Sequence, residues 1–335
     1  MTKAEARKNR KRRKILLSLI MIVFVGVVLT TSTYAWFTAN RTVTVSSIDI
    51  NVSTSEGLQI STDAINWKAI VTNTDITGAS TTYSAAINQV PSGNIVPVST
   101  VGTVVDGLMP MYKGKVETNA STGSNILTST KSTETNGTNG DFVAFDLFFQ
   151  SSQAQTVYLT SSSSVIAKGD DKGIQNAARV AFIKEGSVAY GSAASAAQSI
   201  IGNVATWIWE PNYDVHTTSG ISNASNVYGV TTTAGPGATK LTYQGLKAAF
   251  DDTANVPLNG NSTSFANYFG DVTTVETAAS GIPTSAYLSA FDVAEGVTKV
   301  RIYMWIEGQD VDCEDHASGS ALTYNLQFSI DSSAS

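Results

Sequence analysis

The sequence predicts an all-β fold with loop-rich insertions, and three observations support this prediction. The chain has 335 residues, of which 42% are apolar and only 14% are charged, against about 25% charged residues in typical soluble domains. Serine, threonine, asparagine and glycine supply the remaining polarity, and these residue types favour strands and turns. Short alternating or continuous apolar runs recur along the chain. No sequence repeat of roughly 20–50 residues is present, which argues against a solenoid or a propeller.

The charge is distributed unevenly between the start of the chain and its body. Residues 1–14 hold eight of the 21 Lys and Arg residues and one of the 27 Asp and Glu residues. The rest of the chain therefore has 13 basic and 26 acidic residues, a net charge of −13. Because an acidic surface repels a phosphate backbone, we expect no nucleic-acid partner for the body of the protein.

An export signal is predicted at residues 1–35. The basic head is followed by an uncharged apolar run, Ile15–Leu29, and then by the sequence "TSTYAWFT". These are the parts of a secretory signal peptide, and small residues at positions 33 and 35 suit cleavage after Ala35, which makes Trp36 the first mature residue. The alternative is a retained signal anchor, a transmembrane helix within residues 15–36, which would be the only contact with a membrane. Either way the body is secreted or displayed on the cell surface.

The first predicted strand changes phase in its middle. In "RTVTVSSIDINV", Val43 and Val45 are odd-numbered apolar residues, whereas Ile48 and Ile50 are even-numbered. Because side chains alternate between the two faces of a strand, the change at Ser46-Ser47 predicts a β-bulge or a segment that crosses between sheets.

The remaining strands are expected within a single domain, residues 36–335. The near-continuous apolar run 141–150 predicts a central strand covered on both faces, and a hairpin is expected to join it to the next strand. Loop-rich residues 211–285 are expected to form an insertion with one short helix at Tyr243–Phe250. A strand, a tight turn and a second strand are predicted in residues 57–70, and further strands at 177–186, at 204–211, and at 297–308 and 321–330, the last two joined by an acidic loop.

The N-terminal region resembles a known family. The basic start, the apolar run and "TSTYAWFT" leading into "ANRTVTVSSIDINVSTSEGLQIS" resemble the TasA/camelysin-like proteins of Gram-positive bacteria, which carry a SipW-dependent type of signal peptide. The resemblance covers about residues 10–61. It implies a jelly-roll-like β-sandwich, cleavage by a dedicated signal peptidase, and a role in extracellular biofilm fibres.

In that family the freed N-terminal strand is donated to the sheet of the next subunit. The resemblance therefore implies an extracellular matrix or fibre subunit whose partners are other copies of itself or other matrix proteins. An open groove would supply the backbone hydrogen bonds that the freed strand needs. The alternative is that the strand pairs within its own domain, which gives a secreted monomer. The expected donor residues are Trp36, Phe37, Val43, Val45, Ile48 and Ile50.

The acidic loop "WIEGQDVDCEDHASG" is the candidate metal site. Alternating carboxylates in a loop suit Ca²⁺, which prefers oxygen ligands, although the loop does not match an EF-hand. The alternative is a solvated acidic turn between antiparallel strands, and no other cofactor is predicted. The only cysteine, Cys313, is expected to be a small residue tucked under this loop, with a pKa that the neighbouring carboxylates raise. The candidate Ca²⁺ ligands are Glu307, Asp310, Asp312, Glu314 and Asp315.

Two other function classes were weighed. An extracellular metal-dependent protease would need the two histidines, His216 and His316, but no H-E-x-x-H motif places two ligands on one helix face. No G-x-S-x-G elbow is present either, and we expect that the protein is not an enzyme. A module that binds cell-wall glycans could use Trp207, Trp209 and Tyr213 as stacking platforms, although these rings also suit a core or edge strand.

Overall fold

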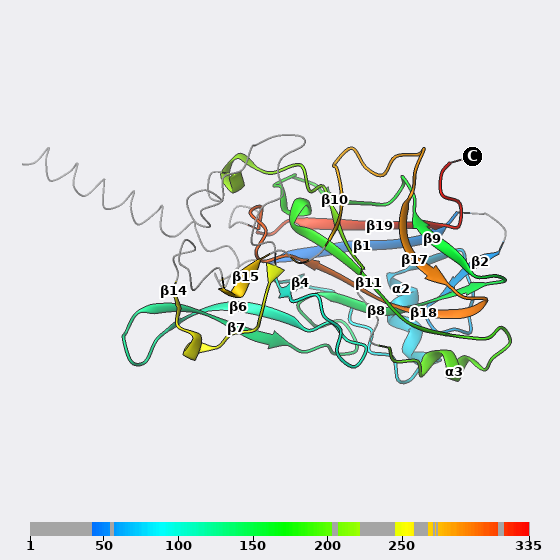
Figure 1. Ribbon diagram of the computed structural model, residues 1–335, viewed down its shortest axis with the longest axis horizontal. Helices are drawn as coiled ribbons and strands as arrows, with labels where there is room; N and C mark the ends of the chain where they lie inside the picture. Colours follow the sequence, from blue (N-terminus) through cyan, green and yellow to red (C-terminus); the bar gives the residue numbers. More distant parts are fainter. Residues whose placement is uncertain are drawn as a thin grey trace, which may run out of the picture.

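The computed structural model describes residues 42–53, 57–202, 207–221, 245–257, 267–270, 272, 274–313 and 318–334. The predicted signal segment and the junction at Ala35 and Trp36 lie outside these residues. Two β-sheets packed face to face form the main body (Figure 1). The all-β class predicted from the sequence is confirmed, and the jelly-roll type of sandwich stays a prediction.

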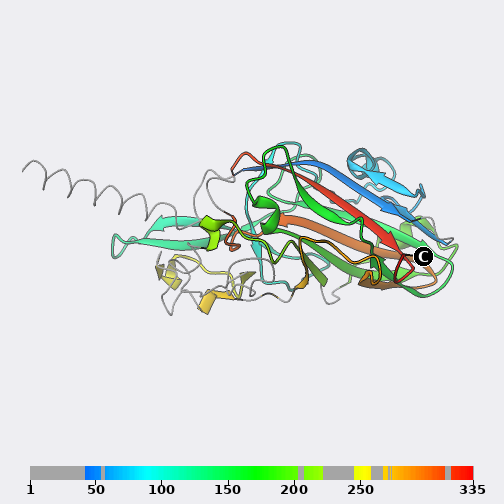
Figure 2. The same cartoon turned by 90° about the horizontal axis from the view of Figure 1, so that it is seen from above.

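The first sheet, called sheet A, contains the N-terminal strand and the C-terminal strand side by side (Figure 2). Ten-residue β1 (Val43–Val52) is a strand because β-branched residues dominate it, and these fit a pleated surface. The order in sheet A is β17 (Leu288–Val293), β9 (Gln155–Leu159), β19 (Ala321–Ser329), β1 and β3 (Ile70–Thr72), with β10 (Ser164–Lys168) also paired to β19 and β4 (Asn94–Ile95) to β1.

The second sheet, called sheet B, contains the longest apolar strands. Its order is β16 (Val275–Thr277), β12 (Trp207–Pro211), β11 (Ala178–Val188), β18 (Gly296–Ile306), β8 (Val143–Ser151) and β2 (Leu58–Ser61).

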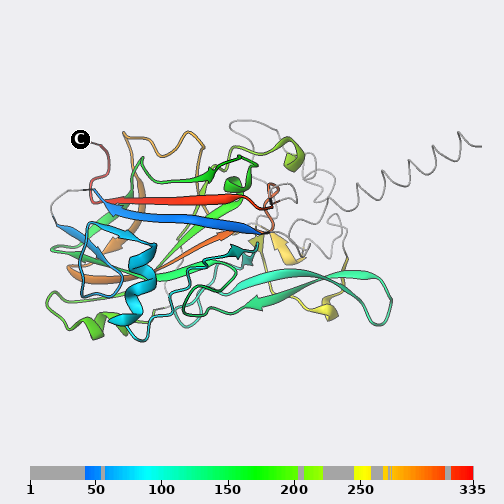
Figure 3. The same cartoon turned by 180° about the vertical axis from the view of Figure 1, so that it is seen from behind.

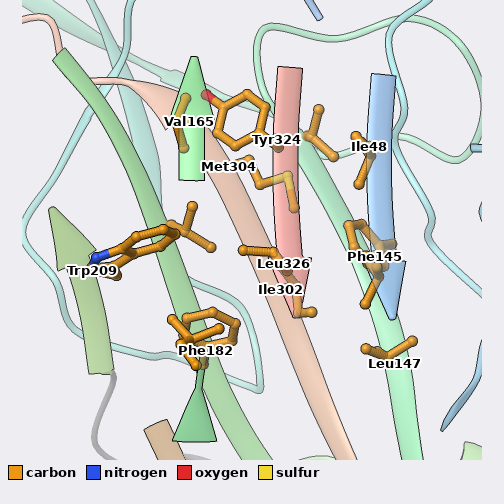
Figure 4. Packing of buried hydrophobic residues seen from close by; sticks show 14 of the residues in the cluster. Ile48, Phe145, Leu147, Val165, Phe182, Trp209, Ile302, Met304, Tyr324 and Leu326 are labelled. Atoms are coloured by element: carbon orange, nitrogen blue, oxygen red, sulfur yellow. The ribbon is translucent and has the colours of Figure 1, made fainter. Parts of the chain in front are cut away.

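The main core fills the space between the two sheets. Side chains of sheet A face side chains of sheet B across this core (Figure 4). The aromatic rings meet edge to face, with centroids 5.1 Å apart for Phe149 and Phe328, a geometry that aromatic pairs prefer. Labelled members of the core are Ile48, Tyr324 and Leu326 from sheet A and Phe145, Leu147, Ile302 and Met304 from sheet B.

Sheet B is buried on both of its faces. Every residue of β18 is buried, and eight of the nine residues of β8 are buried as well, which confirms the prediction for residues 141–150. The face turned away from sheet A packs under a covering layer that includes Tyr83, Ala197 and Met109. This outer face also holds charged side chains, among them Asp146 and Arg301.

Several chain connections cross between the sheets, and two of them bear on the predictions. The strand β8 belongs to sheet B and the next strand, β9, belongs to sheet A, so the hairpin predicted between them is wrong. The acidic loop likewise connects β18 of sheet B to β19 of sheet A, and it is not a turn between paired antiparallel strands. The physical reason is burial of apolar residues: each of these strands buries its apolar side chains in the shared core from the opposite sheet.

A smaller sheet projects from one end of the body (Figures 1 and 3). It is built on the β6–β7 hairpin and has its own apolar cluster, which includes Leu127, Leu246, Phe250 and Phe269. The short helix predicted at 243–250 is wrong for the described part, because Leu246 lies in a strand that pairs with Phe269. The strands are β5 (Ser99–Thr100), β6 (Met111–Thr118), β7 (Asn125–Ser132) and β14 (Val256–Pro257), with the pair β13 (Gly245–Leu246) and β15 (Phe269–Gly270).

The helices among the described residues are short. They include α2 (Asn73–Gly78) and α3 (Ala194–Gln198), with 3₁₀ turns at Ala79–Thr81, Ile174–Ala177 and Asp252–Ala254. Within the described residues, no helix has the length and apolar character needed to cross a membrane.

Candidate functional site

The N-terminal strand β1 lies inside sheet A of its own chain. It runs parallel to β19 from the Thr44–Ala321 pair to the Val52–Phe328 pair. On its other side it runs antiparallel to β3 and β4. Parallel neighbours need a long connection, and here β1 and β19 lie at opposite ends of the described chain.

A β-bulge lies in the middle of β1, where the sequence pattern predicts it. The pairing with β19 shifts between Val45 and Ser47, so that Ser46 is the extra residue. The backbone N–H of Ile48 then donates to the Oδ1 atom of Asn73 at 2.9 Å. The bulge turns the apolar residues on both of its sides toward the same core, which confirms the bulge and not the crossing between sheets.

The apolar residues of β1 are deeply buried. Side chains Val43, Val45, Ile48, Ile50 and Val52 all belong to the main core and are at most 7% exposed. Burial of one such side chain stabilises a fold by about 1.5–3 kcal/mol. Five of them contribute about 10 kcal/mol, an upper estimate that is comparable to the total stability of an ordinary domain.

The contacts of β1 show what its removal would expose. Without β1, the backbone edges of β19, β3 and β4 would lose their partners, and one side of the core would open. An open edge beside an apolar groove readily takes up another strand. The contacts of β1 described above do not depend on whether the strand comes from the same chain or from another copy. This equivalence is the condition for exchange of a terminal element between copies.

The predicted donor residues separate into two groups. The first group lies in the groove of its own chain, as expected if the strand pairs within its own domain and the protein is a secreted monomer. These residues are Val43, Val45, Ile48 and Ile50. Trp36 and Phe37 lie outside the described residues. The structure of a single chain therefore describes the groove and a strand that fits it, and donation between chains stays a prediction.

The acidic loop between β18 and β19 is not a solvated turn. Glu307, Asp310 and Asp312 are each at most 2% exposed, which overturns the solvated alternative. Cys313 is fully buried in the main core under the loop, as predicted. Glu314 and Asp315 lie outside the described residues.

Arg179 compensates part of this buried negative charge. Its guanidinium on β11 lies 2.6 Å from Glu210 and 2.8 Å from Asp310, and it also donates to the carbonyl oxygens of Asn176 and Ala178. The carboxylates hold the pKa of Arg179 above its ordinary value despite burial. Buried charges persist only when they are paired in this way.

His216 and Asp312 form a second pair in the same cluster. The Nδ1 atom of His216 lies 2.8 Å from Asp312. The other oxygen of Asp312 accepts hydrogen bonds from the backbone N–H and the hydroxyl of Thr217. Burial lowers the pKa of His216, but the bond to Asp312 and the nearby carboxylates outweigh burial and raise it. The pair fixes the segment after β12 to the acidic loop.

These contacts bear on the predicted Ca²⁺ site. The nearest ligand atoms of His216, Asp310 and Asp312 lie within 4.8 Å of one another, but both carboxylates already accept hydrogen bonds from protein donors. Burial raises the pKa of Glu307 to about 7, so this carboxyl is partly protonated at neutral pH. A Ca²⁺ ion needs several free, ionised oxygens, and the described members of the set fit it poorly. The Ca²⁺ site stays a prediction that these contacts do not favour.

The histidines expected for a metal-dependent protease can be followed only in part. His216 is bonded to Asp312 as described, and its Nε2 atom is buried without a hydrogen-bond partner. His316 lies outside the described residues. Among the described residues, Asp310 and Asp312 are the groups that could share a metal ion with His216.

A second buried charge cluster lies on the outer face of sheet B, and the sequence analysis missed it. Asp146 lies 2.6 Å from Arg301 and 3.2 Å from Lys299, and Lys299 lies 2.7 Å from Glu185. Glu134 also bonds to Arg301. The available signal was charge at alternate positions of otherwise apolar strands, as in "FDLFF" and "VTKVRIYMW". All these groups have partners, so the cluster attaches the covering layer to the sheet.

The tryptophans proposed as a glycan platform belong to the core. Trp209 is 1% exposed, and its indole N–H donates to the hydroxyl of Thr277 at 2.8 Å. Trp207 is half-buried and packs against the core, with its ring tilted by 45° to that of Phe182 and the ring centroids 5.2 Å apart. The alternative role as edge and core residues of a strand therefore fits both.

Comparisons with known proteins return nothing: no family model, no curated protein and no solved structure matches the chain. The argument for a function therefore rests on the sequence and on the contacts described above.

Proposed function

We propose that the chain is a secreted or cell-surface structural protein whose copies join by exchange of β1. The observation that supports this most is the position of β1. This strand supplies five core side chains and pairs with β19 from Thr44 to Val52 with one bulge at Ser46, and no described element lies before it in the chain. The same contacts can form when the strand comes from a neighbouring copy.

The predicted export signal supports the same proposal. Cleavage after Ala35 frees an N-terminus six residues before Thr42, the first described residue. Trp36 and Phe37 then lead a strand that enters the groove of the next copy, and the vacated groove accepts a strand in turn. Head-to-tail exchange of this kind does not close on itself and produces a fibre. The resemblance to TasA/camelysin-like proteins and their jelly-roll sandwich agrees with this proposal.

The proposal is tested with the full chain secreted from a Gram-positive host. N-terminal sequencing of the recovered protein should give Trp36 as the first residue. The protein is then incubated with a synthetic peptide of residues 36–53, and polymer length is followed by light scattering and electron microscopy.

The peptide carries the strand but has no groove of its own, so it should cap growing ends and shorten the polymers. A peptide of the same composition in scrambled order is the control. Protein that stays monomeric at every concentration, salt and pH tested would contradict the proposal. So would polymers whose length the peptide of residues 36–53 leaves unchanged. Deletion of residues 36–46 from the chain should also abolish growth.

A further inference from the structure

A groove whose described lining residues are all uncharged lies where β1 ends and β2 begins. Its volume is about 400 Å³, and its lining combines small and apolar residues with the amides of Gln59 and Gln150, the hydroxyl of Ser152 and the ring of Tyr190. It lies at the opposite end of β1 from its pairing with Ala321, the first residue of β19 after the acidic loop. Val52, the last residue of β1, belongs to the lining, but the polar side chains named above lie on β2, on β8 and after β8, and on the segment that follows β11.

The two amides are neighbours on the outer face of sheet B. Gln59 on β2 is paired directly with Gln150 on β8, and Gln150 is paired with Val297 on β18. Side chains in directly opposed positions point to the same face and lie about 5 Å apart. The sheet therefore holds the two amides as an adjacent pair.

A close approach of two backbone segments brings Tyr190 next to this pair of amides. Gly296 lies at the start of β18 with φ +113°, and a Cβ there would lie 2.1 Å from the carbonyl oxygen of Val188 and 2.8 Å from the Tyr190 nitrogen. Only glycine permits this approach. The segment that follows β11 is thus held against the sheet, and the Tyr190 side chain extends from it into solvent, 64% exposed.

The polar groups of the groove are available to a ligand. The structure records no hydrogen bond between the side chains of Gln59, Gln150 or Tyr190 and any other described residue. Other glutamines differ: the amide of Gln89 donates to the carbonyl of Phe142 and accepts from Thr135, and Gln327 accepts from Thr160. The adjacent pair Gln59 and Gln150 thus keeps its amides open to a ligand.

We infer that this groove binds a neutral glycan. An exposed aromatic ring offers a flat apolar face to the C–H groups of a sugar ring, and side-chain amides donate to and accept from neighbouring hydroxyls. The described lining residues carry no charge and give no partner to phosphate, sulfate or uronate groups. The site differs from the tryptophan platform predicted on β12, where Trp209 is buried and Trp207 packs against the core.

The inference is tested by titration calorimetry of the full chain, in a detergent without a sugar headgroup, against soluble cello-, xylo-, malto- and chito-oligosaccharides. At least one of these neutral probes should bind. Tyr190→Ala should weaken its binding by about tenfold and Gln150→Ala by a similar factor, whereas Tyr190→Phe should retain binding because the ring remains. Ile166→Ala removes a residue that is 49% exposed on β10 of the other sheet and serves as the matched control.

Melting temperatures equal to that of the wild type would show that the variants are folded, as expected for an exposed Tyr190. The inference would be overturned if none of the oligosaccharides bound. It would also be overturned if an oligosaccharide bound equally well to the wild type, Tyr190→Ala and Gln150→Ala.

Discussion

The stability of the protein should fall as the pH rises from 5 to 8, because buried carboxyls hold their protons in the folded state. Burial raises the pKa of Glu307 from 4.5 to about 7, and burial together with the charge of Asp146 raises that of Glu185 to about 7 as well. In the unfolded chain both groups lose their protons near pH 4.5. Between these values the folded state binds more protons, so the free energy of unfolding decreases with rising pH.

The magnitude follows from the shift of Glu307. A difference of about 2.5 pH units corresponds to about 3 kcal/mol at about 1.4 kcal/mol per unit, as an upper estimate for this carboxyl. His216 acts in the same direction. Its pKa is raised in the folded state, so its contribution is complete below about pH 6.5, its value in the unfolded chain, and is lost as the pH rises through the folded value.

The assay is urea unfolding followed by tryptophan fluorescence at pH 5, 6, 7 and 8. Glu307→Gln cannot titrate and should flatten the curve by about the amount assigned to Glu307, whereas Glu117→Gln on the exposed hairpin should leave its shape unchanged. A wild-type stability that is constant or rises from pH 5 to pH 8 would refute the reasoning. A slope that Glu307→Gln leaves intact would refute the assignment to Glu307.

Three other predictions concern the core and the buried charges. Ile50→Ala should lower the free energy of unfolding by about 2–5 kcal/mol because its side chain is fully buried. Asn51→Ala alters a half-buried position on the other face of β1 and should lower it by less than about 1 kcal/mol. Equal effects of the two substitutions in urea unfolding would contradict the placement of β1. Arg179→Met should destabilise the chain by about 3–5 kcal/mol because Glu210 and Asp310 would lose their buried partner, and a neutral effect on the urea midpoint would contradict the described pairs. Addition of Ca²⁺ after treatment with a chelator should leave the melting temperature unchanged, and a rise of several degrees would show that the acidic loop binds the ion.

Local pattern was sufficient to predict the strands and the bulge. The alternation of Val43 and Val45, followed by Ile48 and Ile50, reveals the bulge because the side-chain period of a strand is two and an extra residue shifts the phase. The long apolar run of β8 predicts burial on both faces for the same kind of reason. The alternation in β1 and the apolar run of β8 are properties of short segments, and the folded chain keeps both.

The candidate site could not be predicted in the same way, because its charges are paired over long distances in the sequence. Arg179 lies 131 residues before Asp310, and His216 lies 96 residues before Asp312. Five carboxylates in nine residues therefore look like a solvated turn until the partner cations are placed. The short helix predicted at 243–250 fails similarly, since Leu246 gains more from pairing and apolar contact with Phe269 than from helix propensity.

The exchange of β1 can be measured directly with a disulfide across the β1–β19 pair. Ser47 and Thr323 are paired in register, and their hydroxyl oxygens lie 3.4 Å apart. Ser47→Cys with Thr323→Cys, in a Cys313→Ala background, is assembled, oxidised and run on a non-reducing denaturing gel. The matched control is Thr156→Cys with Asp292→Cys, which joins β9 to β17 within one chain.

If β1 is exchanged, each disulfide joins two copies, and the gel shows a ladder of covalent oligomers that a reductant collapses to the monomer. The control pair should give only the monomer under the same conditions. A single monomer band from the Ser47 and Thr323 pair, in a preparation that is polymeric by electron microscopy, would contradict the account, because β1 would then remain in the groove of its own chain.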